Sequence, residues 1–107
     1  MTPADGTDLT ALASHGERRN AIIVSDKREA RLVLFSLQEG QQVSGRGEPR
    51  VHLLCLDGEG ELWRGEHRVR AKAGTLLACD VGEAHGAQAG DGRFLVLGII
   101  TPGPTAS

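Results

Sequence analysis

The chain has 107 residues, the length of one domain with a small core. Its 12 basic and 14 acidic residues are mixed along the sequence, and only Phe35, Trp63 and Phe94 are aromatic, which excludes the basic, aromatic-rich surface of a nucleic-acid-binding domain. The longest apolar stretch, residues 94–100, is too short to cross a bilayer, and the first residues lack the pattern of a signal peptide. We therefore expect a cytoplasmic protein without nucleic-acid or membrane partners, and two cysteines, Cys55 and Cys79, fit that reducing compartment.

The first 18 residues differ in pattern from the rest of the chain. Residues 8–13 favour one or two helical turns, with Thr7 or Asp8 as the N-cap and Gly16 as the stop signal. Such a short helix is marginal alone, so it needs a surface to pack on. We divide the chain into a helical or irregular N-terminal segment (1–18), a β-barrel domain (19–101) and a disordered tail (102–107).

From residue 19 onward the pattern is that of an all-β protein. Twelve of the 15 glycines lie between Gly40 and Gly98, and they separate short runs rich in Val, Leu and Ile, which is typical of a sandwich or barrel. The near-continuous apolar run at 31–37 predicts a strand buried on both faces. Asp57-Gly58 favours a type I′ hairpin turn, and Gly90-Asp91-Gly92 favours a second hairpin. The expected strands are residues 21–24, 31–37, 51–56, 59–64, 67–73, 75–79, 85–89 and 94–101.

Residues 74–85 carry the most informative motif. Gly74 opens a strand, Gly82 lies in the following turn, and His85 begins the next strand. This spacing resembles the second signature of the cupin superfamily, with Asp80 in place of the usual proline and Ala89 in place of the usual asparagine. The resemblance covers about residues 31–101, and it implies a double-stranded β-helix, a jelly-roll barrel of two sheets that often forms homodimers. We expect the strand at 31–37 to contribute to the dimer contact.

The first signature of that family, which resembles this chain from Gly40 onward, is degenerate here. In metal-binding members it supplies two histidines and a glutamate, and the second signature supplies one more histidine; of these four only His85 is in place. Counting forward from Gly40 puts Arg46 and Glu48 at the histidine positions and His52 at the glutamate position. Counting back from Gly58 puts Val51 at the glutamate position instead.

The difference of one residue between the two counts decides which side chains face the barrel interior. A one-residue slip turns every side chain of a strand to the opposite face. We prefer the count from Gly58, because the loop before Val51 can absorb a deletion. It turns Val51 and Cys55 inward and His52 outward.

Two functions follow from these alternatives. The favoured one is a barrel pocket for a small organic ligand, lined by His85, Arg46, Cys55 and Val51, without a complete metal site; there Arg46 could bind a carboxylate. The alternative is a metal-dependent enzyme of the dioxygenase or isomerase type, in which His85, His52 and Glu48 hold Fe, Mn, Ni or Zn. A barrel that serves only dimerisation is a third possibility, and whether the chain is an enzyme stays open because fold alone does not decide function.

Overall fold

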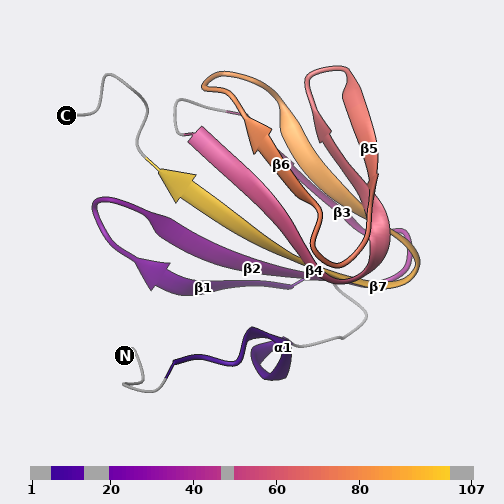
Figure 1. Cartoon of the computed structure of the whole chain (residues 1–107), viewed down its shortest axis with the longest axis horizontal. Coiled ribbons are helices and arrows are strands. Elements are labelled where there is room, and N and C mark those ends of the chain that lie inside the picture. The colour runs from indigo at the N-terminus through magenta and orange to yellow at the C-terminus, as the bar shows by residue number, and fades with distance from the viewer. Residues whose placement is uncertain (1–5, 14–19, 47–49, 102–107) are drawn as a thin grey trace.

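The computed structural model describes residues 6–13, 20–46 and 50–101. The expected tail, Gly16 and Glu48 lie outside these ranges. The elements in chain order are α1 (Leu9–Leu12), β1 (Asn20–Asp26), β2 (Arg31–Leu37), β3 (Gln42–Gly45), β4 (Arg50–Arg64), β5 (His67–Ala71), β6 (Leu76–Cys79) and β7 (His85–Thr101) (Figure 1). Among them there is no helix that is long and apolar enough to cross a membrane.

Two long strands, β4 and β7, organise the molecule. They pair antiparallel along most of their lengths, and each passes through both layers of the fold. One layer has the order β1-β2-β7-β4-β6 and uses the first part of β4 with the last part of β7. The other layer has the order β3-β7-β4-β5 and uses the remaining halves. The two layers are therefore joined by bent strands rather than by loops alone.

The two expected hairpins at residues 57–58 and 90–92 are wrong. Gly58 has the positive φ that the turn prediction requires (+82°), but it serves a bend in a continuous strand. The register of β4 against β7 shifts between Cys55 and Asp57 and again between Gly58 and Gly60, which is the signature of β-bulges. A bulge turns the strand while keeping its hydrogen-bonded neighbour, so the sheet ladder continues where a hairpin would have ended it.

Other elements agree more closely with the sequence pattern. Strand β2 has the expected bounds and is buried on both faces, as its near-continuous apolar run predicts. The helical turn is confirmed as α1, which Asp8 caps by accepting hydrogen bonds from the backbone N–H groups of Thr10 (3.1 Å) and Ala11 (3.2 Å). The short strand β3 was not expected, because Val43 is the only apolar residue in it.

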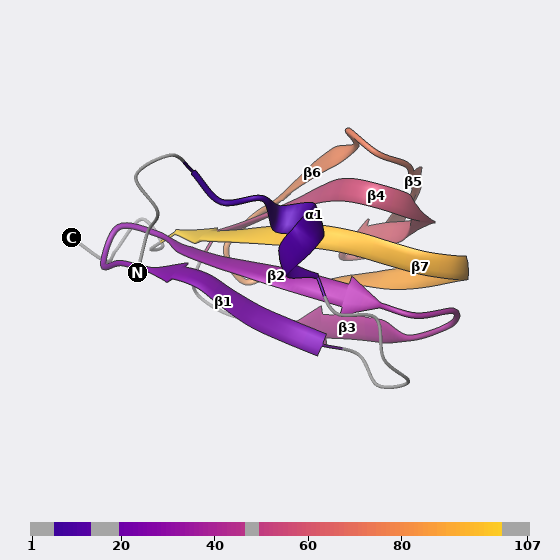
Figure 2. The same cartoon turned by 90° about the horizontal axis from the view of Figure 1, so that it is seen from below.

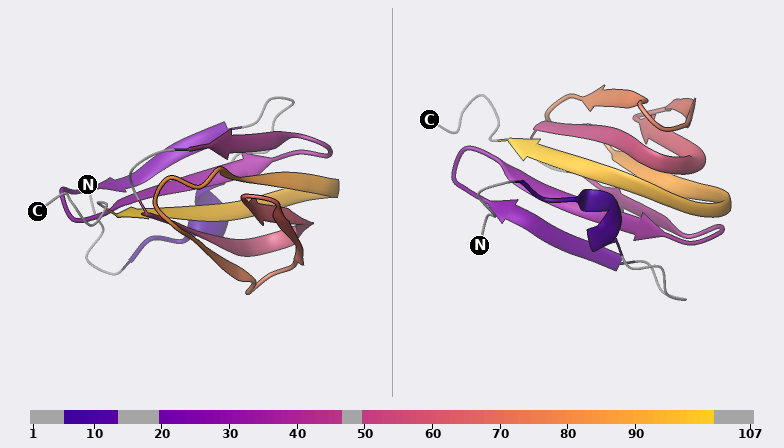
Figure 3. Two further views of the ribbon diagram at one scale, coloured as in Figure 1. Left: turned by 90° about the horizontal axis from the view of Figure 1, so that it is seen from above. Right: turned by 60° about the horizontal axis from the view of Figure 1, so that its bottom comes forward.

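The core lies between the two layers. Inward side chains of the first layer pack against inward side chains of the second, and the largest fully buried one is Phe94. The first layer also buries its outer face: Leu34 and Leu95 are 0% and 1% exposed. Figure 2 and the right panel of Figure 3 show α1 in front of that side of the molecule. No residue of α1 is buried, and Leu12 is 39% exposed, so the helix does not gain the packing that its short length was expected to need.

Candidate functional site

A cavity of about 60 Å³ lies between the layers, beside the first residue of β7. The side chains around it are mostly apolar and come from four strands, namely β2, β3, β4 and both ends of β7. The lining residues are Phe35, Val43, Ser44, Val51, Leu53, His85, Gly86, Gly98 and Ile100. His85 is the only ionisable residue among them, so it dominates the chemistry of the cavity.

His85 is held by its strand register and by one backbone contact. It pairs with Gly45 of β3 and with Arg64 of β4. Its Nδ1 atom lies 3.3 Å from the carbonyl oxygen of Glu83. A Cβ on Gly45 would lie 3.2 Å from Nε2 of His85, so the missing side chain at Gly45 leaves this nitrogen uncrowded.

The register of β4 is the one counted from Gly58. Val51, Leu53 and Cys55 are buried, while His52 between them is only partly buried and pairs with Ala78 and Ile99. Because side chains alternate along a strand, His52 lies on the face opposite to Val51 and away from the cavity. Val51 and His85 therefore share the cavity, whereas His52 does not belong to it.

The other two expected pocket residues lie elsewhere. Arg46 is exposed and follows the last residue of β3, so no strand pairing directs it toward the barrel. Cys55 is fully buried deeper in the core, where its Sγ atom lies 3.6 Å from the carbonyl oxygen of Asp57. Burial raises the pKa of the Cys55 thiol. The hydrogen bond to Asp57 lowers this pKa in part, and the negative charge of Asp57 raises it.

Sequence reasoning missed Arg64, which links the two layers near His85. It follows the buried Leu62 by two residues on β4, so it lies on the inward face. Its Nη1 donates a hydrogen bond of 2.9 Å to the carbonyl oxygen of Ala78 on β6. The neighbouring Cys79 is buried, and burial raises the pKa of its thiol, with the charge of Glu83 adding to that effect. The sequence carried one signal for Arg64: it follows the apolar Leu62 by two residues on an expected strand, and such residues share one face of the strand.

The donor set around the cavity does not fit a metal centre. Across the described ranges, no three residues among His, Cys, Asp and Glu lie together as metal ligands. His85 alone supplies a strong donor to the cavity, whereas a zinc site takes at least three protein ligands. Of the expected triad with His85, His52 lies on the other face and Glu48 falls outside the described residues.

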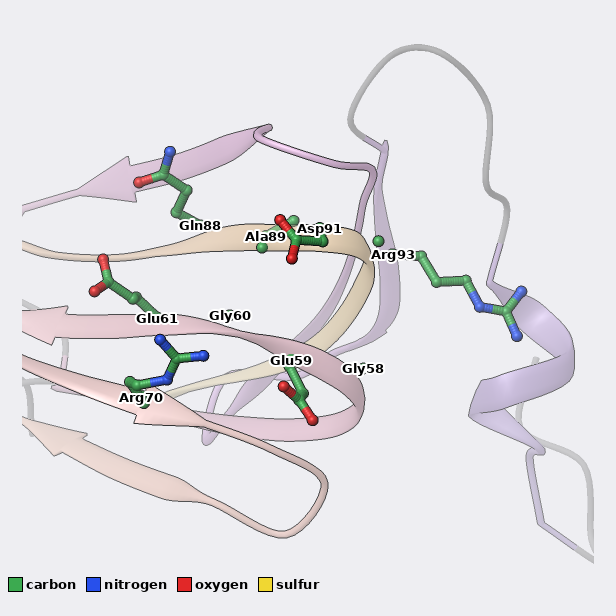
Figure 4. A pocket seen from close by; sticks show the side chains of 11 residues that line it. Gly58, Glu59, Gly60, Glu61, Arg70, Gln88, Ala89, Asp91 and Arg93 are labelled. Atoms are coloured by element: carbon green, nitrogen blue, oxygen red, sulfur yellow. The ribbon is translucent and has the colours of Figure 1, made fainter.

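A second, larger hollow lies on the outer surface where β4 and β7 bend. It is an open groove of about 610 Å³, lined by residues 58–61, Arg70 and residues 88–93 (Figure 4). Glu61 and Arg70 face each other on neighbouring strands, and Arg93 points away from the groove, with its Nη2 3.8 Å from Oδ2 of Asp57. A ligand in this groove would compete with water for every charged group, so we place the candidate site in the less open, more apolar cavity despite its smaller volume.

The comparisons with known proteins agree with the architecture. No protein-family model and no curated protein matches the sequence. Among solved structures, TT1209 from Thermus thermophilus is 24% identical, with a TM-score of 0.84 over 92% of this chain and 97% of that one. A Klebsiella pneumoniae protein with a double-stranded β-helix domain is 18% identical, with a TM-score of 0.81 over 95% and 93%. A cupin superfamily protein from Desulfitobacterium hafniense is 17% identical, with a TM-score of 0.80 over 94% of both chains. The expected double-stranded β-helix is confirmed.

Proposed function

We propose that this cupin-type chain binds a small organic molecule inside its barrel, with His85 as the polar contact. The observation that carries the proposal is the cavity itself, which is lined mostly by apolar side chains and offers one imidazole. A few polar groups in an otherwise apolar cavity are the usual composition of a small-molecule site. Val51 and Leu53 supply part of the apolar wall.

The size of the cavity limits the ligand. Its volume of about 60 Å³ lies far below the roughly 300–1,000 Å³ of sites for drug-sized ligands. Only a compact molecule fits without movement of the wall. Short alcohols, and five-membered rings that extend through its open side, are the size class that we expect.

The metal-dependent enzyme remains the competing proposal. Its triad needs His52 inside the barrel, which would require a slip of β4 by one residue. Such a slip would also turn Val51, Leu53 and Cys55 out of the core. Metal analysis of the purified protein distinguishes the two proposals.

The experiment measures Fe, Mn, Ni and Zn in the wild type, in His85→Ala and in His67→Ala. His67 is exposed on β5, so it is a matched control for loss of an imidazole. We expect metal well below one equivalent in all three proteins. Stoichiometric metal in the wild type and in His67→Ala, lost in His85→Ala, would establish a metal centre and overturn the proposal.

We also propose that the chain forms a homodimer through β1. The outward side chains of β2, which we expected at the contact, are already buried within one chain. Strand β1 ends the strand order, and its Ile23 is 57% exposed. Light scattering should give a mass of twice the 11.3 kDa of one chain. The mass should fall to that of one chain in Ile23→Lys. It should stay unchanged in Leu76→Lys, which alters a similarly exposed residue of β6. A monomeric wild type contradicts this.

A further inference from the structure

We infer that the barrel cavity selects ligands that donate a hydrogen bond, such as a small alcohol or a five-membered N–H heterocycle, over carboxylates and over molecules that only accept. This inference rests on the proposed small-molecule function and names the ligand class for it. It follows from the partner of one ring nitrogen and from the absence of a cation among the residues that line the cavity.

The partner of Nδ1 determines which nitrogen of neutral His85 carries the proton. Nδ1 lies 3.3 Å from the carbonyl oxygen of Glu83, and a carbonyl oxygen only accepts hydrogen bonds. Nδ1 therefore carries the hydrogen and donates it. Nε2, on the side of Gly45, is left with a lone pair, so a ligand that reaches it meets an acceptor.

The surroundings of Nε2 favour a neutral donor. The residues lining the cavity include no arginine or lysine, and Ser44 is the only other residue with a polar side chain. A carboxylate would lose its hydration without gaining a cation among the lining residues, which is a large cost in an apolar cavity; the Nη1 of nearby Arg64 already donates to the Ala78 carbonyl oxygen. A ligand without a donor would desolvate Nε2 and leave it unpaired, which also weakens binding.

Pyrrole and furan form a matched pair of probes, because they have nearly the same ring shape and differ in one N–H donor. Protein-observed NMR titration gives the dissociation constant of each for the wild-type chain. We expect pyrrole to bind about tenfold more tightly than furan, the effect of one satisfied hydrogen bond. Propionate should bind more weakly than either.

Two variants test the role of Nε2. His85→Phe keeps a ring but removes the acceptor, so the preference for pyrrole should disappear. Gly45→Ala leaves His85 in place but puts a methyl group about 3.2 Å from Nε2, so it should lower the affinity for pyrrole several-fold more than that for furan. Gly92→Ala, where an added Cβ meets nothing within 4 Å, should retain the wild-type preference.

The nitrogen chemical shifts of the His85 ring report the protonated nitrogen directly, and we expect the proton on Nδ1. Equal affinity for pyrrole and furan, or a proton on Nε2, would overturn the donor preference while leaving the small-molecule site standing. A tenfold preference that survives in both His85→Phe and Gly45→Ala would also overturn it. If none of the probes perturbs the residues lining the cavity, the proposed function itself fails.

Discussion

Replacing Gly60 by alanine tests the bend that carries β4 from one layer to the other. An added Cβ at this position would overlap the carbonyl oxygen of Gln88 and would lie 2.8 Å from two carbons of the Phe94 ring. Phe94 is fully buried, and the Gln88 carbonyl belongs to the neighbouring strand β7. Neither atom can move aside without displacing the sheet.

The expected cost of Gly60→Ala follows from this overlap. Overpacking a well-filled core costs about 1–3 kcal/mol and occasionally more. With both obstacles held in place, we expect about 3 kcal/mol, which lowers the melting temperature of a domain of this size by about 10–20 °C. Gly92→Ala makes the same chemical change in open space without a positive φ, and it should alter the free energy of unfolding by less than about 1 kcal/mol.

Urea unfolding followed by circular dichroism measures both variants against the wild type, with stability taken from the midpoint at constant slope. Gly60→Ala should shift the midpoint to lower urea concentration while Gly92→Ala leaves it nearly unchanged. The reasoning is refuted if Gly60→Ala unfolds within about 0.5 kcal/mol of the wild type, or if both variants lose stability equally.

Three further predictions concern the core, the thiols and the tryptophan. Leu34→Ala empties a fully buried site on the outer face of β2 and should cost about 2–5 kcal/mol in the same urea assay; a loss below about 1 kcal/mol would mean that this face is open. Burial raises the pKa of Cys55 and Cys79, so their thiols ionise at lower pH in the unfolded chain than in the folded one. The free energy of unfolding should therefore fall as pH rises above the usual thiol pKa of about 8.5. A double Cys→Ala variant that keeps the same slope of stability against pH contradicts this. The Arg68 guanidinium lies 4.7 Å from the ring centroid of Trp63, so Arg68→Ala should cost about 0.5–1 kcal/mol and shift the tryptophan emission to the red; unchanged emission would show that the arginine does not cover the ring.

The sequence could predict what depends on periodicity and spacing. Strand β2 follows from a near-continuous apolar run, and the inward position of Val51 follows from a count of residues. That count used Gly58 as a hairpin anchor, and it gave the right register although Gly58 lies at a bulge. A glycine with positive φ fits either a hairpin turn or a β-bulge. A bulge forms where a neighbouring strand continues to pair on both sides of the glycine. Only the tertiary pairing of β4 with β7 supplies that strand.

The candidate site was predictable only in part, for a similar reason. His85 and Val51 are at the cavity because each lies on a strand whose register the motif spacing already implies. Phe35 and Gly98 line the same cavity from β2 and β7, and no local pattern connects them; an added Cβ at Gly98 would lie 2.9 Å from the Phe35 ring. Arg46 lies beyond the end of a strand that residue propensities do not reveal, so its position could not be deduced.

The NMR titration of the wild-type chain with pyrrole tests the central claim most directly, because it reports where a small molecule binds. The account predicts saturable shifts of the Val51, His85 and Gly86 amides at the barrel cavity, with Arg70 and Gln88 in the outer groove unchanged. Shifts confined to the groove residues, or no saturable shift at the cavity, would contradict it.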